Sequence, residues 1–419
     1  MPRREREGTP QRGPFAPDRL DEAITRLSDL AARQPSNQQV FYQLGLAHMQ
    51  RGDAMAAAPN FRRAAELRPN DGNALYLLGV ALADTGDADG AQAAWRRLLT
   101  VEPGHVTARY MLGRLLAVNG RLVEAAAELR TVLKGGQEAP AGVTARAAEA
   151  LGEVELARGD RQQALIAWRE GLRREPENLV LLGNIAAALL DLGQYDEAIG
   201  LAERAKRLGD KRPVVDYNLG IAHLAKGDAG AAVRHLRAAA AAAPDDLLIR
   251  ARLAAALWSA GQKKAAWAEL NDVLAKAPSN ADALTQAGAM HLAEGSDAKA
   301  DELWSKAGDH PPARSARAAL AEQQGRLADA DALWQGLAAA DAANPVPWLR
   351  RGIIALRRND PKSAAVLAGE ALARAPELPD ALAVLGLAEW RTGKGPDRLR
   401  KAGRRSVEDL LTPEERRSL

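Results

Sequence analysis

The sequence predicts an all-α fold in which short helices stack pairwise into a solenoid, and three regularities of spacing lead to that prediction. A glycine recurs in steps of 34 residues, with one step of 39 and one of 30. A small residue precedes each of these positions by seven residues, and an alanine follows nearly all of them by five. Asn359 replaces the glycine at one step, and asparagine also tolerates a left-handed backbone, so these positions are interpreted as helix C-caps. The capping glycines are Gly52, Gly86, Gly120, Gly159, Gly193, Gly227, Gly261, Gly295, Gly325 and Gly393.

Each capping position is expected to end the first helix of a pair and to precede the second. An aspartate suited to an N-cap often comes directly after it. These aspartates are Asp53, Asp87, Asp160, Asp228 and Asp360. Prolines recur where the second helix should end, because proline blocks its continuation. They are Pro35, Pro69, Pro103, Pro176, Pro244, Pro278, Pro312, Pro345 and Pro376. Helices of about a dozen residues are marginal alone in water, so they must bury their apolar faces on neighbouring repeats.

The residue pattern within one step resembles the tetratricopeptide repeat, whose order is aromatic, Leu-Gly, Ala, large apolar and Pro. The first two repeats supply it with Phe41, Leu44, Gly45, Ala57, Phe61 and Pro69, then Leu75, Leu78, Gly79, Ala91, Trp95 and Pro103. The resemblance covers roughly residues 18 to 395. It implies a right-handed α-α superhelical solenoid of about ten helix-turn-helix repeats, in which the first helices line a concave surface.

Departures from the repeat predict the domain organisation. Five extra residues near Gly135 predict a loop at 135–143 between one block at 18–134 and a second at 144–395. Residues 1–17 are predicted to be a disordered polar tail, and 18–34 half a repeat. Four residues are missing near His310, and the ninth repeat has Arg317 at a leucine position. Residues 396–419 are predicted to form a basic C-terminal cap, where Thr412 and Glu415 have the spacing of a capping box.

Composition excludes several classes of function. Hydrophobic content of 47% with only 4% aromatics suits helices packed through alanine and leucine. The absence of cysteine excludes disulfides, thiolate zinc sites and a cysteine nucleophile. The polar start and the lack of a long apolar run indicate neither a signal peptide nor a membrane span, so a cytoplasmic location is expected. Residues 391–419 carry a net charge of +4, but no aromatic residue is interleaved with the basic patch, so we do not expect nucleic-acid binding.

No catalytic constellation is found, and the chain is predicted to be non-catalytic, with no cofactor or metal. His48, His223 and His291 occupy the same offset in three separate repeats, so they cannot share one metal ion. The resemblance places a packing side chain there. The other histidines lack the spacing of a zinc signature, and there is no phosphate loop, dinucleotide fingerprint or nucleophile elbow.

Large apolar side chains at one offset predict a partner-binding surface. Trp95, Trp168, Trp304 and Trp334 recur on second helices and are predicted to be core. Trp258 and Trp390 instead lie three residues before a capping glycine, on first helices. From the fourth to the eighth repeat, the side chain at this position is large and apolar, and the residues are Leu156, Leu190, Leu224, Trp258 and Leu292. Neighbouring offsets add Val214, Ile221 and Leu248. This strip either binds a partner or seals one first helix against the next, and both interpretations stay open.

Polar residues on the same helices predict how a partner is oriented. Asn184 and Asn218 share one offset in consecutive repeats, and Arg252 follows at that offset. The resemblance implies that asparagine there grips the backbone of an extended peptide, although asparagine is also the common family residue. Tyr42, Tyr76 and Tyr110 form a ladder one residue earlier, with Tyr217 in the sixth repeat, and predict a second surface in the N-terminal block.

The predicted function is a scaffold or adaptor that binds a partner helix or extended apolar peptide in the concave groove. Trp258, Leu224, Leu190 and Ile221 are expected to supply burial. Asn184, Asn218 and Arg252 are expected to fix orientation. The alternative is an accessory subunit of a larger enzyme, secretion, pilus or envelope-assembly complex that docks by a large folded surface. The sequence leaves open the identity of the partner and the oligomeric state.

Overall fold

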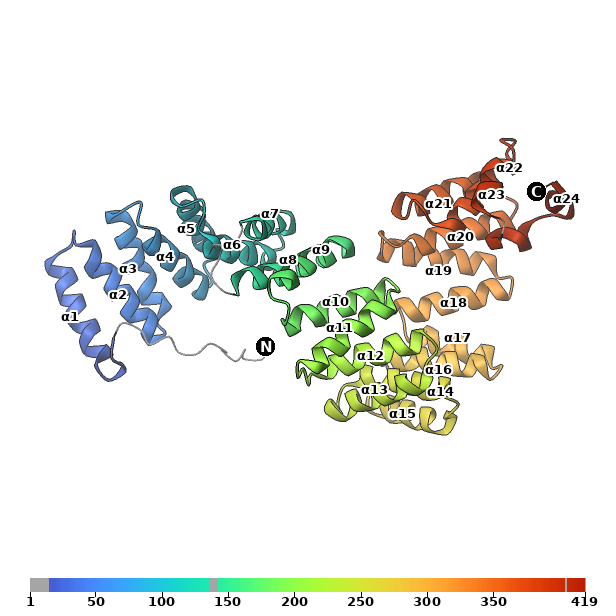
Figure 1. Cartoon of the computed structure of the whole chain (residues 1–419), viewed down its shortest axis with the longest axis horizontal. Coiled ribbons are helices and arrows are strands. Elements are labelled where there is room, and N and C mark those ends of the chain that lie inside the picture. The colour runs from blue at the N-terminus through green and yellow to red at the C-terminus, as the bar shows by residue number, and fades with distance from the viewer. Residues whose placement is uncertain (1–14, 136–141, 404, 419) are drawn as a thin grey trace. The chain divides into compact units, whose positions relative to one another are not determined.

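The computed structural model of the chain is an all-α solenoid of consecutive helix pairs (Figure 1). It describes residues 15–135, 142–403 and 405–418, and every regular element within these ranges is a helix. The predicted all-α class is confirmed. The chain divides into two compact units, unit 1 (Met1–Ala188) and unit 2 (Leu189–Leu419), which are described separately below. Most of the tail predicted at 1–17 and of the loop predicted at 135–143 lies outside the described residues, so those boundaries stay predictions.

Unit 1 begins with the single helix α1, which packs on α2, and continues as helix pairs α2/α3, α4/α5, α6/α7 and α8/α9. Its elements are η1 (Pro17–Arg19), α1 (Leu20–Arg33), α2 (Gln38–Arg51), α3 (Ala54–Leu67), α4 (Gly72–Asp84), α5 (Ala88–Val101), α6 (Val106–Val118), α7 (Leu122–Lys134), α8 (Val143–Ala157) and α9 (Arg161–Arg174). The boundary between the units lies within the next helix, α10 (Leu179–Asp191).

Unit 2 contains the pairs α12/α13, α14/α15, α16/α17, α18/α19 and α20/α21, and α22 then packs on α21, α23 and η3. Its elements are α11 (Tyr195–Arg207), α12 (Pro213–Ala225), α13 (Ala229–Ala242), α14 (Leu247–Ser259), α15 (Lys263–Lys276), α16 (Ala281–Ala293), α17 (Asp297–Lys306), α18 (Pro311–Gln323), α19 (Leu327–Ala340), α20 (Pro345–Arg357), α21 (Pro361–Arg374), α22 (Pro379–Arg391), α23 (Asp397–Ala402), η3 (Arg405–Leu410) and α24 (Pro413–Ser418). The four-residue deletion shortens α17, and Arg317 on α18 pairs with Asp301 at 2.9 Å.

The predicted helix caps are confirmed, but two of the nine prolines predicted to end a helix do not. All ten capping glycines have positive φ, and Asn359, with φ of 60°, is the one non-glycine residue of that kind within the described ranges. Each of the five predicted aspartate caps accepts a hydrogen bond from a backbone N–H three residues ahead. Two prolines were assigned to the wrong helix. Pro312 and Pro345 lie in the first turns of α18 and α20, where proline is tolerated because no helical acceptor awaits its missing N–H.

A large side chain on the second helix fills the space above a glycine on the first. Trp95, Trp168 and Trp304 are at most 2% exposed, which confirms the core prediction. Their indole N–H groups donate to main-chain carbonyls of the paired first helix, as in Trp304 Nε1 to Thr285 O at 3.0 Å. A Cβ at Gly288 would lie 2.3 Å from the indole nitrogen of Trp304. The small residue is therefore needed for the two helices to cross closely.

The C-terminal helices cover the last repeat. Leu399, Val407 and Leu411 are buried in one cluster with residues of α20, α21 and α22. The predicted capping box is confirmed, because the Thr412 N–H donates to Glu415 Oε2 at 2.7 Å and the Glu415 N–H donates to Thr412 Oγ1 at 3.2 Å. Both carboxylate oxygens of Glu415 also accept from Arg391, at 2.9 and 3.1 Å. The terminal helix α24 is thus tied to the end of α22.

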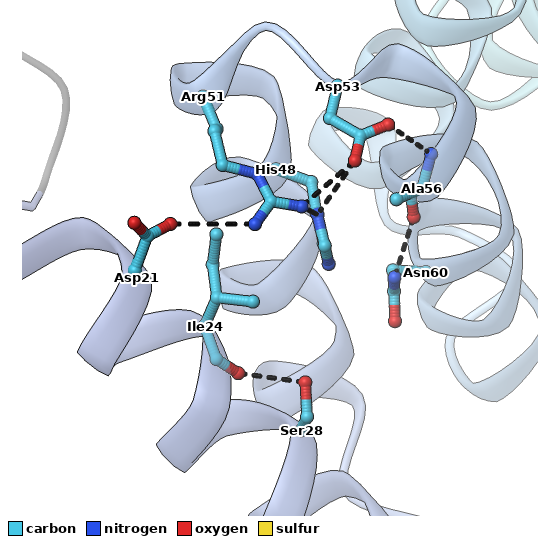
Figure 2. A network of polar contacts seen from close by, with 8 residues as sticks. All are labelled: Asp21, Ile24, Ser28, His48, Arg51, Asp53, Ala56 and Asn60. Atoms are coloured by element: carbon cyan, nitrogen blue, oxygen red, sulfur yellow. Dashed lines mark hydrogen bonds and ion pairs between the residues drawn. The ribbon is translucent and has the colours of Figure 1, made fainter.

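A polar network joins α1 to the first repeat (Figure 2). Arg51 contacts Asp21 of α1 at 3.5 Å, Asp53 at 2.9 Å and the Nδ1 atom of His48 at 3.2 Å. Asp53 also caps α3 by accepting from the Ala56 N–H at 3.0 Å. His48 is 9% exposed, as expected for a packing histidine. Burial and the guanidinium of Arg51 lower the pKa of His48 below its usual range, while the carboxylate of Asp53 partly opposes them.

His48 is expected to make this end of unit 1 sensitive to acid. Above pH 6.5, the ordinary pKa, its imidazole is mostly neutral in both the folded and the unfolded state. As the pH falls from there toward the lower pKa of the folded state, the unfolded chain takes up the proton first, so stability declines. Unfolding midpoints measured over this range should fall less steeply for His48→Gln than for the wild type. A pKa of His48 at or above 6.5 in an NMR titration of the folded protein would contradict this assignment.

Candidate partner-binding surface

Most predicted contact residues of unit 2 lie on three successive first helices, α12, α14 and α16, and Leu190 lies on α10. Tyr217, Ile221 and Leu224 of α12 and Trp258 of α14 all pack against one core cluster of α13, α14, α15 and α16. Leu292 of α16 packs instead against a separate cluster that contains Leu284 and Trp304. The structure therefore brings four of these apolar side chains onto one cluster, and Leu292 onto the next.

The exposed fraction distinguishes residues that pack between helices from residues that a partner could contact. Tyr217, Ile221, Leu224 and Trp258 are half-buried. Val214 on α12 and Leu248 on α14 are 40% and 38% exposed, and each is the second residue of its helix. We call Val214, Tyr217, Asn218, Ile221, Leu248 and Arg252 the α12–α14 face. On this face the half-buried side chains pack against the core, whereas Val214 and Leu248, near the starts of their helices, keep apolar surface exposed to solvent.

Two buried donors on this face lack acceptors. Asn218 is 3% exposed, and its Nδ2 atom has no hydrogen-bond partner within the described part of the chain. The Nε atom of Arg252, at the same offset one repeat later, is in the same condition. A buried donor without an acceptor costs roughly 1–3 kcal/mol, so few are found in folded proteins. A carbonyl or carboxylate oxygen that accepts a hydrogen bond from either atom would remove this free-energy cost.

A chain of polar contacts holds Arg252 in place. Its Nη2 atom donates to Asp282 Oδ1 of α16 at 3.1 Å. Asp282 lies 3.8 Å from His310 Nε2, and His310 Nδ1 lies 3.0 Å from Thr285 Oγ1. Burial raises the pKa of Tyr217 above its usual range, although Arg252 opposes the shift. The contacts connect α14, α16 and the start of α18.

Trp258 belongs to an aromatic group that the sequence interpretation missed. The Lys263 ammonium lies 4.8 Å from the centroid of the Trp258 ring, and Trp267 meets that ring edge-on at 6.3 Å. His291 of α16 lies 4.9 Å from the Trp267 centroid. Lys263 and Trp267 of its own repeat thus partly cover Trp258, and His291 of the next repeat contacts Trp267. Trp267 occupies no position of the repeat pattern, so that pattern gave no signal for it.

The remaining predicted residues lie elsewhere. Asn184 and Leu190 are half-buried on α10, on either side of the unit boundary. Their role in binding stays a prediction.

The three tyrosines of the ladder in unit 1 pack against neighbouring side chains. Tyr110 is 7% exposed, with the guanidinium carbons of Arg114 and Arg146 at 5.8 and 5.9 Å from its ring centroid. Tyr76 stacks on His105 at 5.4 Å, and Tyr42 meets Phe61 edge-on at 6.0 Å. Burial is the main cause that raises the pKa of Tyr42 and of Tyr76. A binding role for the three tyrosines stays a prediction.

The described residues contain neither a candidate metal cluster nor a candidate membrane span. They contain no group of three or more histidine, cysteine, aspartate or glutamate side chains arranged to hold a metal ion. None of the helices described is both long enough and apolar enough to span a bilayer.

Comparison with known families decides what the repeat is. Tetratricopeptide repeat models match residues 18–71, 42–91, 76–142 and 349–409, and a second such model matches residues 121–279. The chain belongs to the tetratricopeptide repeat family. These matches together cover well over half of its length.

Individual tetratricopeptide proteins resemble the chain only distantly. Human tetratricopeptide repeat protein 28 is 32% identical over 92 residues, which span 21% of this chain and 4% of the human protein. A tetratricopeptide repeat protein from Parabacteroides merdae is 18% identical, with a TM-score of 0.46 over 56% of this chain and 91% of its own. Yeast Tom70 is 11% identical, with a TM-score of 0.42 over 90% of this chain and 100% of its own.

Proposed function

We propose that this tetratricopeptide chain is a non-catalytic scaffold that binds a partner protein through its α12–α14 face. The partner supplies an extended apolar peptide or the apolar side of an amphipathic helix. Tetratricopeptide repeats are in general protein-interaction scaffolds, and the choice of this face is specific to the present chain. A cytoplasmic location remains part of the proposal.

The pair of unmatched donors carries the proposal. Asn218 Nδ2 and Arg252 Nε occupy the same offset on consecutive first helices, and both lack an acceptor within the described residues. Arg252 is already oriented by Asp282, so little side-chain entropy remains to be lost when a ligand binds. A peptide carbonyl or carboxylate would satisfy such donors, while Val214 and Leu248 would be buried by the partner's apolar side chains. The two donors would then orient the backbone of the peptide, and burial of apolar side chains would contribute to the affinity.

The variant Val214→Asp/Leu248→Asp tests this proposal. Both residues lie in the first turn of a helix, where an acidic side chain favours the helix dipole, so the variant is expected to fold. Loss of two apolar anchors should weaken partner binding by about 2 kcal/mol or more, which corresponds to about thirtyfold. The tagged wild type and variant would be purified from their own cells, and the retained proteins compared by mass spectrometry. The affinity of the identified partner would then be measured.

A matched variant on a second helix provides the control. Val366→Asp alters a valine that is 67% exposed on α21, which follows α14 by seven helices along the chain. We expect it to retain the same partner as the wild type. Retention of the same proteins by the Val214→Asp/Leu248→Asp variant, with unchanged affinity, would contradict the proposal.

One observation favours docking by a large folded surface as the second candidate. Exposed apolar side chains also occur on second helices, including Met55 on α3 at 81% exposed and Val366 on α21 at 67%. An accessory subunit of a larger complex would use such residues together with the first helices. Loss of the partner in both Val366→Asp and Val214→Asp/Leu248→Asp would support this candidate over a single peptide site.

A further inference from the structure

A preformed cleft lies in unit 1 between two successive second helices, α7 and α9. Its volume is about 450 Å³, and both helices pack against α8, which supplies Leu151 to the lining. Leu133 of α7, Leu151 and Ala167 of α9 are at most 8% exposed, while Ile166 of α9 is 58% exposed. The lining therefore combines a buried apolar floor with one isoleucine whose side chain is available to a partner.

Basic side chains exceed carboxylates around this cleft. Glu155 is buried and accepts from two guanidinium groups, those of Arg130 at 2.5 Å and Arg158 at 2.7 Å. Glu170 likewise pairs with Arg173 at 2.8 Å and Arg174 at 3.2 Å. These arginines, Arg173 foremost, hold the pKa of Glu170 below its usual range. Each carboxylate is thus shared by two cations, which leaves an excess of positive charge.

Lys134 adds to that excess and Arg174 fixes the rim. Lys134 ends α7 as an exposed residue, and no ion pair involves it within the described residues. The Nη2 atom of Arg174 donates to the Leu133 carbonyl at 3.2 Å, which ties α9 to the C-terminal turn of α7. A rim fixed before binding lowers the ordering cost of association.

We propose that the cleft between α7 and α9 is a second docking site, which takes an acidic amphipathic helix of a partner protein. One or two large apolar side chains of that helix contact Leu133, Leu151 and Ile166. Its glutamates, one turn away, face Lys134 and the arginine-rich rim. The excess positive charge disfavours a basic helix, and the lining has no aromatic side chain on which a nucleic-acid base would stack.

The full-length chain would be titrated against two fluorescein-labelled peptides by fluorescence anisotropy. One peptide consists of repeated Glu-Glu-Leu-Leu units, and the other replaces every glutamate with lysine. We expect saturable binding of the acidic peptide and at least tenfold weaker binding of the basic one. Ile166→Asp should lower the affinity for the acidic peptide at least tenfold. Lys134→Glu should lower that affinity several-fold and reduce the salt dependence of binding.

A control variant separates this site from other exposed apolar side chains. Val366→Asp changes an exposed valine that, like Ile166, lies two residues after the recurring alanine of its second helix. It should bind the peptide as the wild type does.

The proposal is overturned by any of three results: no saturable binding of the acidic peptide, equal binding of both peptides, or equal effects of Ile166→Asp and Val366→Asp. Light scattering provides a further check. If the wild type is a dimer and Ile166→Asp converts it to a monomer, the cleft is an interface between copies of this chain, and the partner-helix proposal fails.

Discussion

Replacing Trp304 with alanine is expected to lower the free energy of unfolding of unit 2 by about 3–5 kcal/mol. The indole is 1% exposed, and its N–H donates to the Thr285 carbonyl at 3.0 Å. It also fills the space above Gly288, where an added Cβ would lie 2.3 Å from the indole nitrogen. The loss therefore combines the lost burial of a large apolar group, a lost indole hydrogen bond and an unfilled space between α16 and α17.

Urea denaturation followed by circular dichroism measures this loss, and hydrogen exchange in α16 and α17 locates it. Trp258→Ala in the same unit is the matched control, since that tryptophan is half-buried and should cost markedly less. Equal losses for the two variants would show that burial does not distinguish them. The interpretation of Trp304 as the core residue of its repeat would then be wrong.

Replacing Glu322 with alanine is expected to cost about 2 kcal/mol, somewhat less than the usual loss for a fully buried charge pair. The Glu322 side chain is 2% exposed, and its carboxylate accepts from Trp334 Nε1 at 2.7 Å and from Arg350 at 3.0 and 2.7 Å. Removal leaves the indole and the guanidinium without their acceptor. Arg350 is 35% exposed, and water then solvates part of its charge, which reduces the penalty.

Glu322→Gln is the matched variant for this prediction. The amide retains an oxygen for the Trp334 indole but loses the charge that Arg350 contacts, so its loss of stability should be smaller than that of Glu322→Ala. Both are measured from urea denaturation midpoints. An alanine variant as stable as the wild type would mean that the contacts of Glu322 contribute nothing to the stability of unit 2.

The parts of the fold that depend on residues within one repeat were predictable from sequence. Gly52 and its equivalents adopt the left-handed backbone because a tight turn must follow the first helix, and Asn359 does the same. Asp53 and its equivalents cap the following helix for the same local reason. Trp304 was predictable as core because its glycine partner lies at a fixed distance in the sequence.

Contacts between repeats were not predictable from that pattern, because they depend on positions that vary from one repeat to the next. Arg252 pairs with Asp282, and Glu322 pairs with Arg350, each at a separation somewhat shorter than one repeat. Pairs of opposite charge at such separations are a signal that the sequence contains. The burial of Asn218 and Tyr110 depends on how closely neighbouring helices approach, which side-chain volumes across several repeats determine.

Binding of a partner protein by the α12–α14 face is tested most directly by photo-crosslinking in the protein's own cells. A benzoylphenylalanine would replace Leu248 in one strain and Val366 in another, since both side chains are exposed. We expect position 248 to crosslink to one defined protein under ultraviolet light and position 366 not to do so. Crosslinks from position 366 alone, or none from position 248, would contradict binding at this face.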